Sequence, residues 1–175
     1  MLYIGIYYTN QTIEAYRELE NHGYLKGSEK FIYPDFLPSY QWMIEQMDKR
    51  INNNGSFPIW LWKEKPNLNE EGHFPKGTKS VCLTVEIPDD NVLLSDFDTW
   101  HYILNTWFLP LTEEEDDLFE AGKLKISMEQ SWERIFDFEL LQKSELWNEY
   151  PPTIQGVIPI IRKEQIIDIE YFIAE

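Results

Sequence analysis

The alternation of apolar and polar residues predicts strands near both ends of the chain. Residues 80–87 give the clearest signal, because every second side chain is apolar and one face is therefore expected to be buried. Residues 2–9 are rich in aromatic and β-branched side chains, which is typical of a strand. Two segments rich in isoleucine, residues 153–161 and 166–173, return the chain to strand structure. We expect these four strands to form one mixed sheet.

Helices are predicted between the strands by apolar residues that recur at spacings of three and four. This pattern covers residues 12–21, which end before Gly23, and residues 38–51. A third helix is expected at residues 99–107. The sequence contains neither an internal repeat nor a segment that resembles a linker. We therefore predict one α+β domain over residues 1–175, with the helices packed on the sheet.

Three helix starts are marked by a Ser or Thr that is followed three residues later by an acidic residue or Gln. In such a capping box, each of the two side chains bonds a backbone N–H that the first turn of the helix leaves unpaired. The pattern occurs at Ser95 and Asp98, at Thr112 and Glu115, and at Ser127 and Gln130. We expect helices to begin at these three points.

Acidic residues outnumber basic residues by 31 to 15, which gives a net charge of -16. Nucleic-acid backbones and anionic membrane surfaces are bound through Lys and Arg, so we expect neither as a partner. Residues 80–122 contain eleven acids and neither Lys nor Arg. Such a segment is either a solvated face that keeps the protein soluble or a face that docks a basic protein partner.

The sequence predicts a cytoplasmic location. The first ten residues contain no basic residue and no small-residue cleavage site, unlike a signal peptide. No segment reaches the roughly 18 consecutive apolar residues that a membrane helix requires. The single cysteine, Cys82, excludes an internal disulfide and a multi-cysteine metal centre.

Asp96, Asp98 and His101 place two carboxylates and an imidazole at a predicted strand-to-helix junction. Side chains of these types can bind a divalent metal. The alternative is that one of the two Asp residues caps the helix and that His101 lies on its flank. We favour the cap, because it requires only residues that are already in place, and we predict no metal site.

Trp60 and Trp62 lie two residues apart in the apolar segment 57–62, so on a strand they would share one face. Aromatic side chains usually cover a core or its rim. The alternative is an aromatic wall on which a nicotinamide, a base or a sugar stacks. The lysine-bearing segment 63–79 follows directly and could close over an anionic ligand at such a wall.

Four blocks of the sequence resemble a bacterial family that is described only as a domain of unknown function, DUF3841. The blocks are Pro58–Trp62, His73–Lys79, Ile87–Asn105 and Ser131–Asp137. The resemblance extends over nearly the whole chain, and the third block is long and specific. It indicates membership of this family, whose name implies no activity, substrate or catalytic residue.

The two ends of the chain also resemble the ADP-ribosyltransferase-like fold. A first strand and a helix are followed by Gly23-Tyr24-Leu25, and residues 154–161 and 166–173 are similar to the closing strands of that superfamily. The resemblance places Gln155 where the superfamily has a catalytic Glu, and tyrosines where its first strand carries Arg or His. It therefore implies an NAD-related pocket that has altered chemistry or binds a ligand without catalysis.

Two hypotheses of different class follow. The first is a pocket for a nucleotide-like ligand, with NAD as the cofactor to test. Its site would draw on Tyr7, Trp60, Trp62, His101, Tyr102 and Gln155. The second is a non-catalytic acidic interaction module that docks a basic protein partner through residues 86–120. A cavity around Gln155 would favour the first hypothesis, and acids spread over one face would favour the second.

Overall fold

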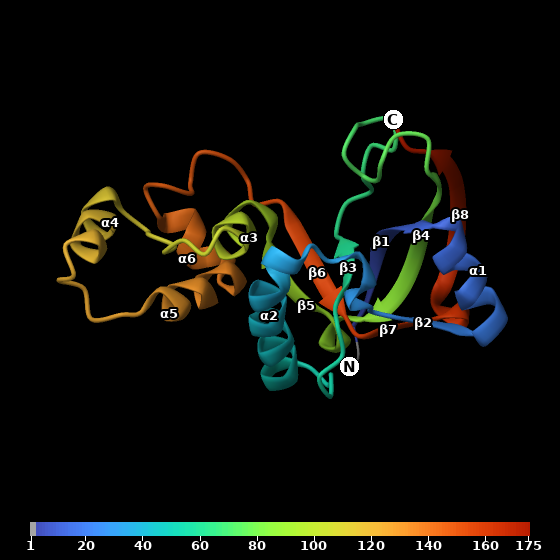
Figure 1. Cartoon of the computed structure of the whole chain (residues 1–175), viewed down its shortest axis with the longest axis horizontal. Coiled ribbons are helices and arrows are strands. Elements are labelled where there is room, and N and C mark those ends of the chain that lie inside the picture. The colour runs from blue at the N-terminus through green and yellow to red at the C-terminus, as the bar shows by residue number, and fades with distance from the viewer. Residues whose placement is uncertain (1–2) are drawn as a thin grey trace. The chain divides into compact units, whose positions relative to one another are not determined.

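Both ends of the chain contribute strands to one sheet (Figure 1). The structure, a computed structural model, describes residues 3–175. Within these residues one sheet has six strands in the order β5-β6-β3-β1-β4-β8. The strands are β1 (Ile4–Thr12), β3 (Ile59–Trp62), β4 (Lys79–Pro88), β5 (Leu93–Asp96), β6 (Ile154–Ile158) and β8 (Ile166–Ile173). The α+β prediction is confirmed, and Leu2 of the first predicted strand lies outside the described residues.

The described part of the chain divides into two compact units. Unit 1 comprises Met1–Ile32, Tyr40–Leu93 and Gly156–Glu175, and unit 2 comprises Tyr33–Ser39 and Leu94–Gln155. The division falls within β5, β6 and the helix α2 (Leu37–Arg50). That residues 1–175 form one domain stays a prediction.

In unit 1 the register of β1 and β4 separates the two faces of the sheet. These strands pair antiparallel, with Tyr7 opposite Val85 and Thr9 opposite Leu83, and all four side chains are buried. Side chains alternate between the faces, so Tyr8 lies on the opposite face. The core of unit 1 therefore lies on the face of Tyr7.

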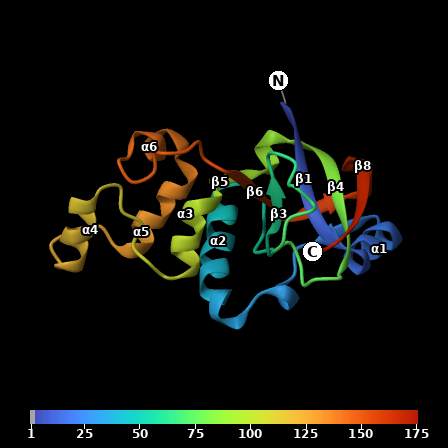
Figure 2. The same cartoon turned by 90° about the horizontal axis from the view of Figure 1, so that it is seen from above.

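Two helices of unit 1 contact the sheet through aromatic rings. The helix α1 (Ile13–His22) lies beside β4 and β8 (Figure 2), and the Tyr16 ring meets the Tyr171 ring edge to face at 6.4 Å. Gly23 ends α1 with a φ of 81°, a left-handed conformation that glycine adopts without strain. In α2, Tyr40 meets Trp60 of β3 edge to face at 6.1 Å.

The predicted strand 153–161 is broken at Pro159. Proline has no N–H to continue a strand ladder, so β6 ends at Ile158. The chain resumes as β7 (Ile160–Arg162), which pairs with β2 (Tyr24–Lys26) in a separate two-stranded sheet of the described residues. Short 3-10 helices complete the unit: η1 (Glu29–Phe31), η3 (Asp89–Asn91) and η5 (Lys163–Gln165).

Unit 2 is helical, and its helices are grouped together in Figure 1. They are η2 (Pro34–Phe36), α3 (Phe97–Leu104), α4 (Glu113–Glu120), α5 (Met128–Trp132), η4 (Glu133–Phe136) and α6 (Phe138–Lys143). Trp100, Ile103, Leu109, Ile135 and Leu141 are buried and form its core. This core consists of large apolar side chains from several short elements, none of which would be stable alone.

Two of the three predicted helix starts are confirmed. Thr112 accepts a hydrogen bond from the backbone of Glu115, and Ser127 and Gln130 form a complete capping box. The third is wrong, because Asp96 rather than Ser95 caps α3. The predicted helix 99–107 also ends early, at Leu104, since Thr106 adopts a left-handed φ of 57°.

Residues 107–111 form an irregular segment, buried at residues 108–110, whose backbone is bonded by side chains. A buried carbonyl without a partner is costly, so a segment outside regular structure needs partners from elsewhere. Side chains of the following helices and their connections supply them at 2.6–2.7 Å. The carbonyls of Trp107, Leu109, Pro110 and Leu111 accept from Trp132 Nε1, Arg134 Nη1, Trp147 Nε1 and Ser144 Oγ, respectively. These hydrogen bonds tie the segment to the second half of unit 2.

Over residues 3–175, none of the helices combines the length and the apolar character needed to cross a membrane.

Candidate functional site

A cavity of about 190 Å³ opens within unit 2 where the start of α3 meets α6 and the segment that follows it. One water requires roughly 10–15 Å³ of such space, so the cavity holds more than a single solvent molecule. Three of its lining side chains are acidic: Asp96, Asp98 and Glu149. Two aromatic side chains, Trp147 and Tyr150, line it as well. No Lys, Arg or His from residues 3–175 lines this cavity, which is therefore a negatively charged pocket with aromatic walls.

Asp96 places a buried carboxylate at the inner end of the cavity. It is the last residue of β5 and the cap of α3, and its side chain is only 4% exposed. Its Oδ2 atom accepts hydrogen bonds from the backbone N–H of Thr99 at 2.9 Å and from the Thr99 hydroxyl at 2.8 Å. The other oxygen, Oδ1, accepts no hydrogen bond from residues 3–175. This oxygen remains available to a ligand.

Asp98 adds a second carboxylate beside the first. Burial raises the pKa of Asp98, the negative charge of Asp96 raises it further, and His101 acts in the opposite direction. The ionised form of Asp98 is thus less favoured than that of a free aspartate. A cation in the cavity would favour the ionised form, because opposite charge stabilises it.

The pKa of Asp98 is expected to respond in opposite directions to two substitutions. Asp96→Asn keeps a capping oxygen but removes the repulsion, so the pKa of Asp98 should fall while burial still holds it above its ordinary value. His101→Gln removes the group that lowers this pKa, so the pKa should rise. Carboxyl-carbon NMR titration of the three proteins measures both changes. A pKa of Asp98 that is the same in all three would contradict the pairing of the two carboxylates.

The aromatic and amide walls of the cavity are fixed by internal contacts. Trp147 donates its indole N–H to the Pro110 carbonyl at 2.7 Å, and its ring meets Tyr102 edge to face at 5.1 Å. Gln142 donates from Nε2 to the Tyr150 carbonyl at 3.2 Å, which leaves its Oε1 as an acceptor. The walls are thus positioned in the free protein, which lowers the entropic cost of binding.

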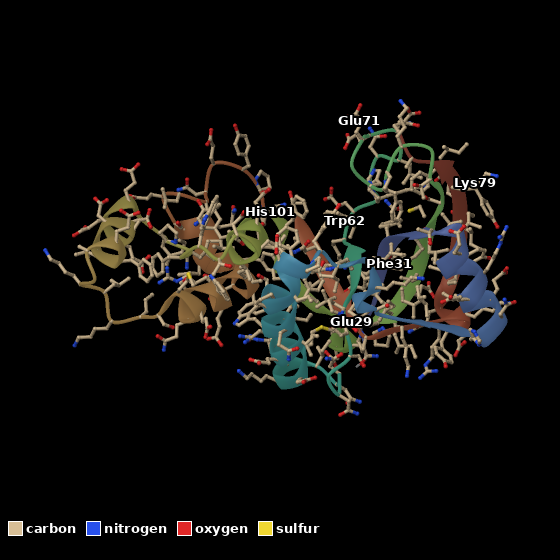
Figure 3. All side chains as sticks on the ribbon, in the orientation of Figure 1. Glu29, Phe31, Trp62, Glu71, Lys79 and His101 are labelled. Carbon is tan, nitrogen blue, oxygen red and sulfur yellow. The ribbon has the colours of Figure 1, made fainter. Side chains whose placement is uncertain are left out.

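Three of the six predicted site residues, Tyr7, Trp60 and Trp62, lie in unit 1. They do not share one face of the sheet. Trp62, which is labelled in Figure 3, pairs with Tyr8. Side chains alternate between the faces, so Trp60 and Trp62 lie on the face opposite Tyr7. Tyr7 is 1% exposed, and its hydroxyl donates to Asp89 Oδ1 at 2.6 Å. Burial, followed by this hydrogen bond, raises the pKa of Tyr7. Tyr7 and the two tryptophans therefore cannot form one wall.

The lysine-bearing segment after Trp62 is engaged in contacts of its own. Lys63 lies over the Tyr7 ring at 4.4 Å, and Lys65 forms an ion pair with Glu170. His73 bonds Asn10 at 3.1 Å. A second cavity, of about 610 Å³, lies between this segment and β8, and none of the six predicted residues lines it. The one lysine in its lining is Lys65, whose charge is already balanced by Glu170.

The other three predicted residues lie in unit 2. His101 is exposed, and its Nδ1–H donates to the Phe97 carbonyl at 2.9 Å. Gln155 is 4% exposed and donates to Ser95 at 3.3 Å. Tyr102 contacts the Trp147 ring of the cavity lining, and His101 lowers the pKa of Asp98, another lining residue. A ligand-binding role for the six residues stays a prediction.

Sequence reasoning identified the two aspartates but missed the opposite wall of the cavity. Asp96 is confirmed as the cap of α3. In residues 3–175 no three His, Cys, Asp or Glu side chains are grouped so that they could hold a metal ion. Trp147, Glu149 and Tyr150 follow α6 in sequence, just before Pro151-Pro152. The sequence could have indicated this wall only through the density of aromatic, acidic and proline residues in the segment. No sequence pattern connects that segment with Asp96.

Comparison with known proteins identifies a family for this chain. Neither the curated proteins nor the solved structures contain a match. The model of one family, Domain of unknown function (DUF3841), matches residues 6–123, which is more than half of the chain. The matched range includes Asp96 and Asp98 and ends before the opposite wall of the cavity. The chain belongs to the DUF3841 family.

Proposed function

We propose that unit 2 is a non-catalytic interaction module that binds a basic segment of a partner protein through the Asp96–Asp98 cavity. One observation carries the proposal: the cavity is lined by three carboxylates and two aromatic rings, without a basic residue from the described part of the chain. Carboxylates attract a cation directly, and the faces of Trp and Tyr rings attract it through their quadrupoles. The described lining contains no Ser, Thr, Cys or Lys, which supports a binding role over covalent catalysis by such a residue.

The charge of unit 2 supports a basic partner. The unit contains fifteen acidic and four basic residues, a net charge of -11, whereas unit 1 carries the remaining -5. Most acids of α4 have no ion-pair partner within the described residues: Glu113, Glu114, Asp116, Asp117 and Glu120. Charge of one sign over a surface raises the association rate of an oppositely charged partner.

A nucleotide fits this cavity less well than a cation does. Drug-sized and cofactor ligands occupy pockets of about 300–1,000 Å³, and this cavity has about 190 Å³. The phosphates of a dinucleotide would also approach three carboxylates. A nucleotide-like ligand at the face of Trp60 and Trp62 stays a prediction.

The proposal predicts salt-sensitive binding of a basic peptide that depends on Asp98. A short peptide rich in Lys and Arg should bind the whole protein, whereas a Glu-rich peptide of equal length should not. Asp98→Asn should weaken binding about tenfold, because it removes a charge from the cavity lining. Isothermal titration calorimetry at two salt concentrations measures both effects.

Glu164→Gln provides a matched control. It removes one exposed charge from η5 of unit 1 and should leave peptide affinity unchanged. If neither peptide binds, or if both variants weaken binding equally, the cavity is not the docking site.

A further inference from the structure

We infer that the cavity accepts a primary ammonium group, that of a lysine side chain of the partner, in preference to the guanidinium of an arginine. The inference rests on the proposed function and specifies its ligand. Two observations support it: the hydrogen-bond acceptors that remain unused beside Asp96, and the apolar side chains that line the rest of the cavity.

The buried end of the cavity offers few acceptors. Among the lining residues, Asp96 and Leu141 are the most buried, with 4% and 2% exposure. The Oδ2 atom of Asp96 is used by two donors of Thr99, so one oxygen of this carboxylate remains. Leu141 offers none. The group that reaches this end must therefore be satisfied by a single oxygen of Asp96 and by acceptors of the other lining residues.

An ammonium group fits this arrangement better than a guanidinium does. An ammonium has three donors around a compact charge, which single oxygens from different residues can satisfy: Asp96, Asp98 and Gln142. A guanidinium has five donors in a plane and pairs best with both oxygens of one carboxylate. At Asp96 one oxygen is already used, so a guanidinium could not form this paired arrangement with the most buried carboxylate of the lining.

The remaining walls fit the alkyl stem of a lysine. Leu141, Leu146 and the two consecutive prolines, Pro151 and Pro152, form apolar parts of the lining. Lysine carries a long apolar stem behind its charge, and such stems are buried along apolar surface. Tyr150 is 72% exposed, so its ring stands at the opening, where the side chain would enter. The lining thus combines apolar side chains with carboxylates.

Two peptides that differ only in one central residue, Lys or Arg, test the inference. With the whole protein, the Lys peptide should bind at least about fivefold more tightly than the Arg peptide. Asp96→Asn should reduce affinity for the Lys peptide about tenfold, because an amide donor would then face the ammonium. An asparagine still caps α3, so thermal unfolding should change little. Propylammonium and putrescine serve as free-amine probes and should bind more weakly than the peptide.

The outcomes separate this inference from the proposed function. If both peptides bind equally and Asp98→Asn weakens both, the lysine preference is wrong and the docking function stands. If no basic peptide binds, the proposed function fails as well. A putrescine affinity above that of the Lys peptide overturns the assignment to a protein side chain. Displacement of the peptide by Mg²⁺ beyond the effect of equal ionic strength overturns the ammonium site.

Discussion

Replacing Arg134 by methionine is expected to lower the free energy of unfolding by about 3 kcal/mol, as measured by urea denaturation. Arg134 joins Glu115 through two hydrogen bonds, at 2.6 and 2.8 Å, and also bonds the Leu109 carbonyl at 2.7 Å. The two charged side chains are 15% and 19% exposed. Methionine would fill the space of the arginine stem but leave the Leu109 carbonyl without its side-chain donor and the Glu115 carboxylate with only the hydrogen bond from the Leu111 N–H.

The effect should depend on pH. Burial acts to raise the pKa of Glu115, but hydrogen bonds from Arg134 and from the Leu111 backbone outweigh it and hold the pKa below its usual range. A carboxyl with a lowered pKa contributes stability above its unfolded-state pKa, and this contribution is lost as the pH falls through the folded-state pKa. The difference between the native protein and Arg134→Met should therefore be largest at neutral pH and shrink in acid.

Lys143→Met is the matched control for Arg134→Met. Lys143 pairs with Glu139 at 2.6 Å, but the two side chains are 71% and 80% exposed, and such pairs contribute about 0–1 kcal/mol. An equal loss of stability in both variants would contradict the account of residues 107–111 as a segment held by side chains.

Gly27→Ala should destabilise unit 1 by about 3 kcal/mol, again by urea denaturation. A Cβ atom at this position would lie 1.9 Å from the Phe57 carbonyl oxygen, which is a backbone atom. The backbone itself would have to move, and with it the adjoining pairing of β2 with β7. The chain approaches closely here because glycine has no side chain.

Gly5→Ala is an informative comparison for Gly27→Ala. Its added Cβ would meet Asp89 Oδ1 at 2.3 Å and the Tyr7 ring at 2.6 Å. Both obstacles are side chains: the exposed Asp89 can shift, and although the Tyr7 ring is buried, moving it should cost less than moving backbone. If Gly5→Ala proved more destabilising than Gly27→Ala, the close backbone approach at Gly27 would not be the constraint that we infer.

Local patterns predicted the elements that depend on local physics. The segment 80–87 alternates because Val81, Leu83, Val85 and Ile87 point into the core, although Ser80 and Cys82 of the other face are buried too. It differs from the observed Lys79–Pro88 only at its ends. The strand 166–173 is found with the predicted bounds. The short elements β2 and β7 were not predicted as a pair, because three residues carry no periodicity and their pairing joins segments far apart in sequence.

The sequence indicated only one of the two segments that form the candidate site. Asp96 and Asp98 stand out because two acids at a strand-to-helix junction suggest either a cap or a ligand site. Their partners Trp147 and Tyr150 lie about fifty residues later, and no pattern of spacing relates the two segments. The acids of residues 86–120 were grouped by sequence, yet Glu86, Asp89 and Asp90 belong to unit 1 and the others to unit 2.

Chemical-shift mapping by NMR tests the central claim most directly. The whole protein, labelled with nitrogen-15, is titrated with the lysine-containing peptide, and the amide signals that move are assigned. We predict that the moving signals belong to Asp96, Asp98 and residues 141–150, with those of Trp60 and Trp62 unchanged. Shifts centred on Trp60 and Trp62, or no shifts at saturating peptide, would contradict a cation-binding cavity in unit 2.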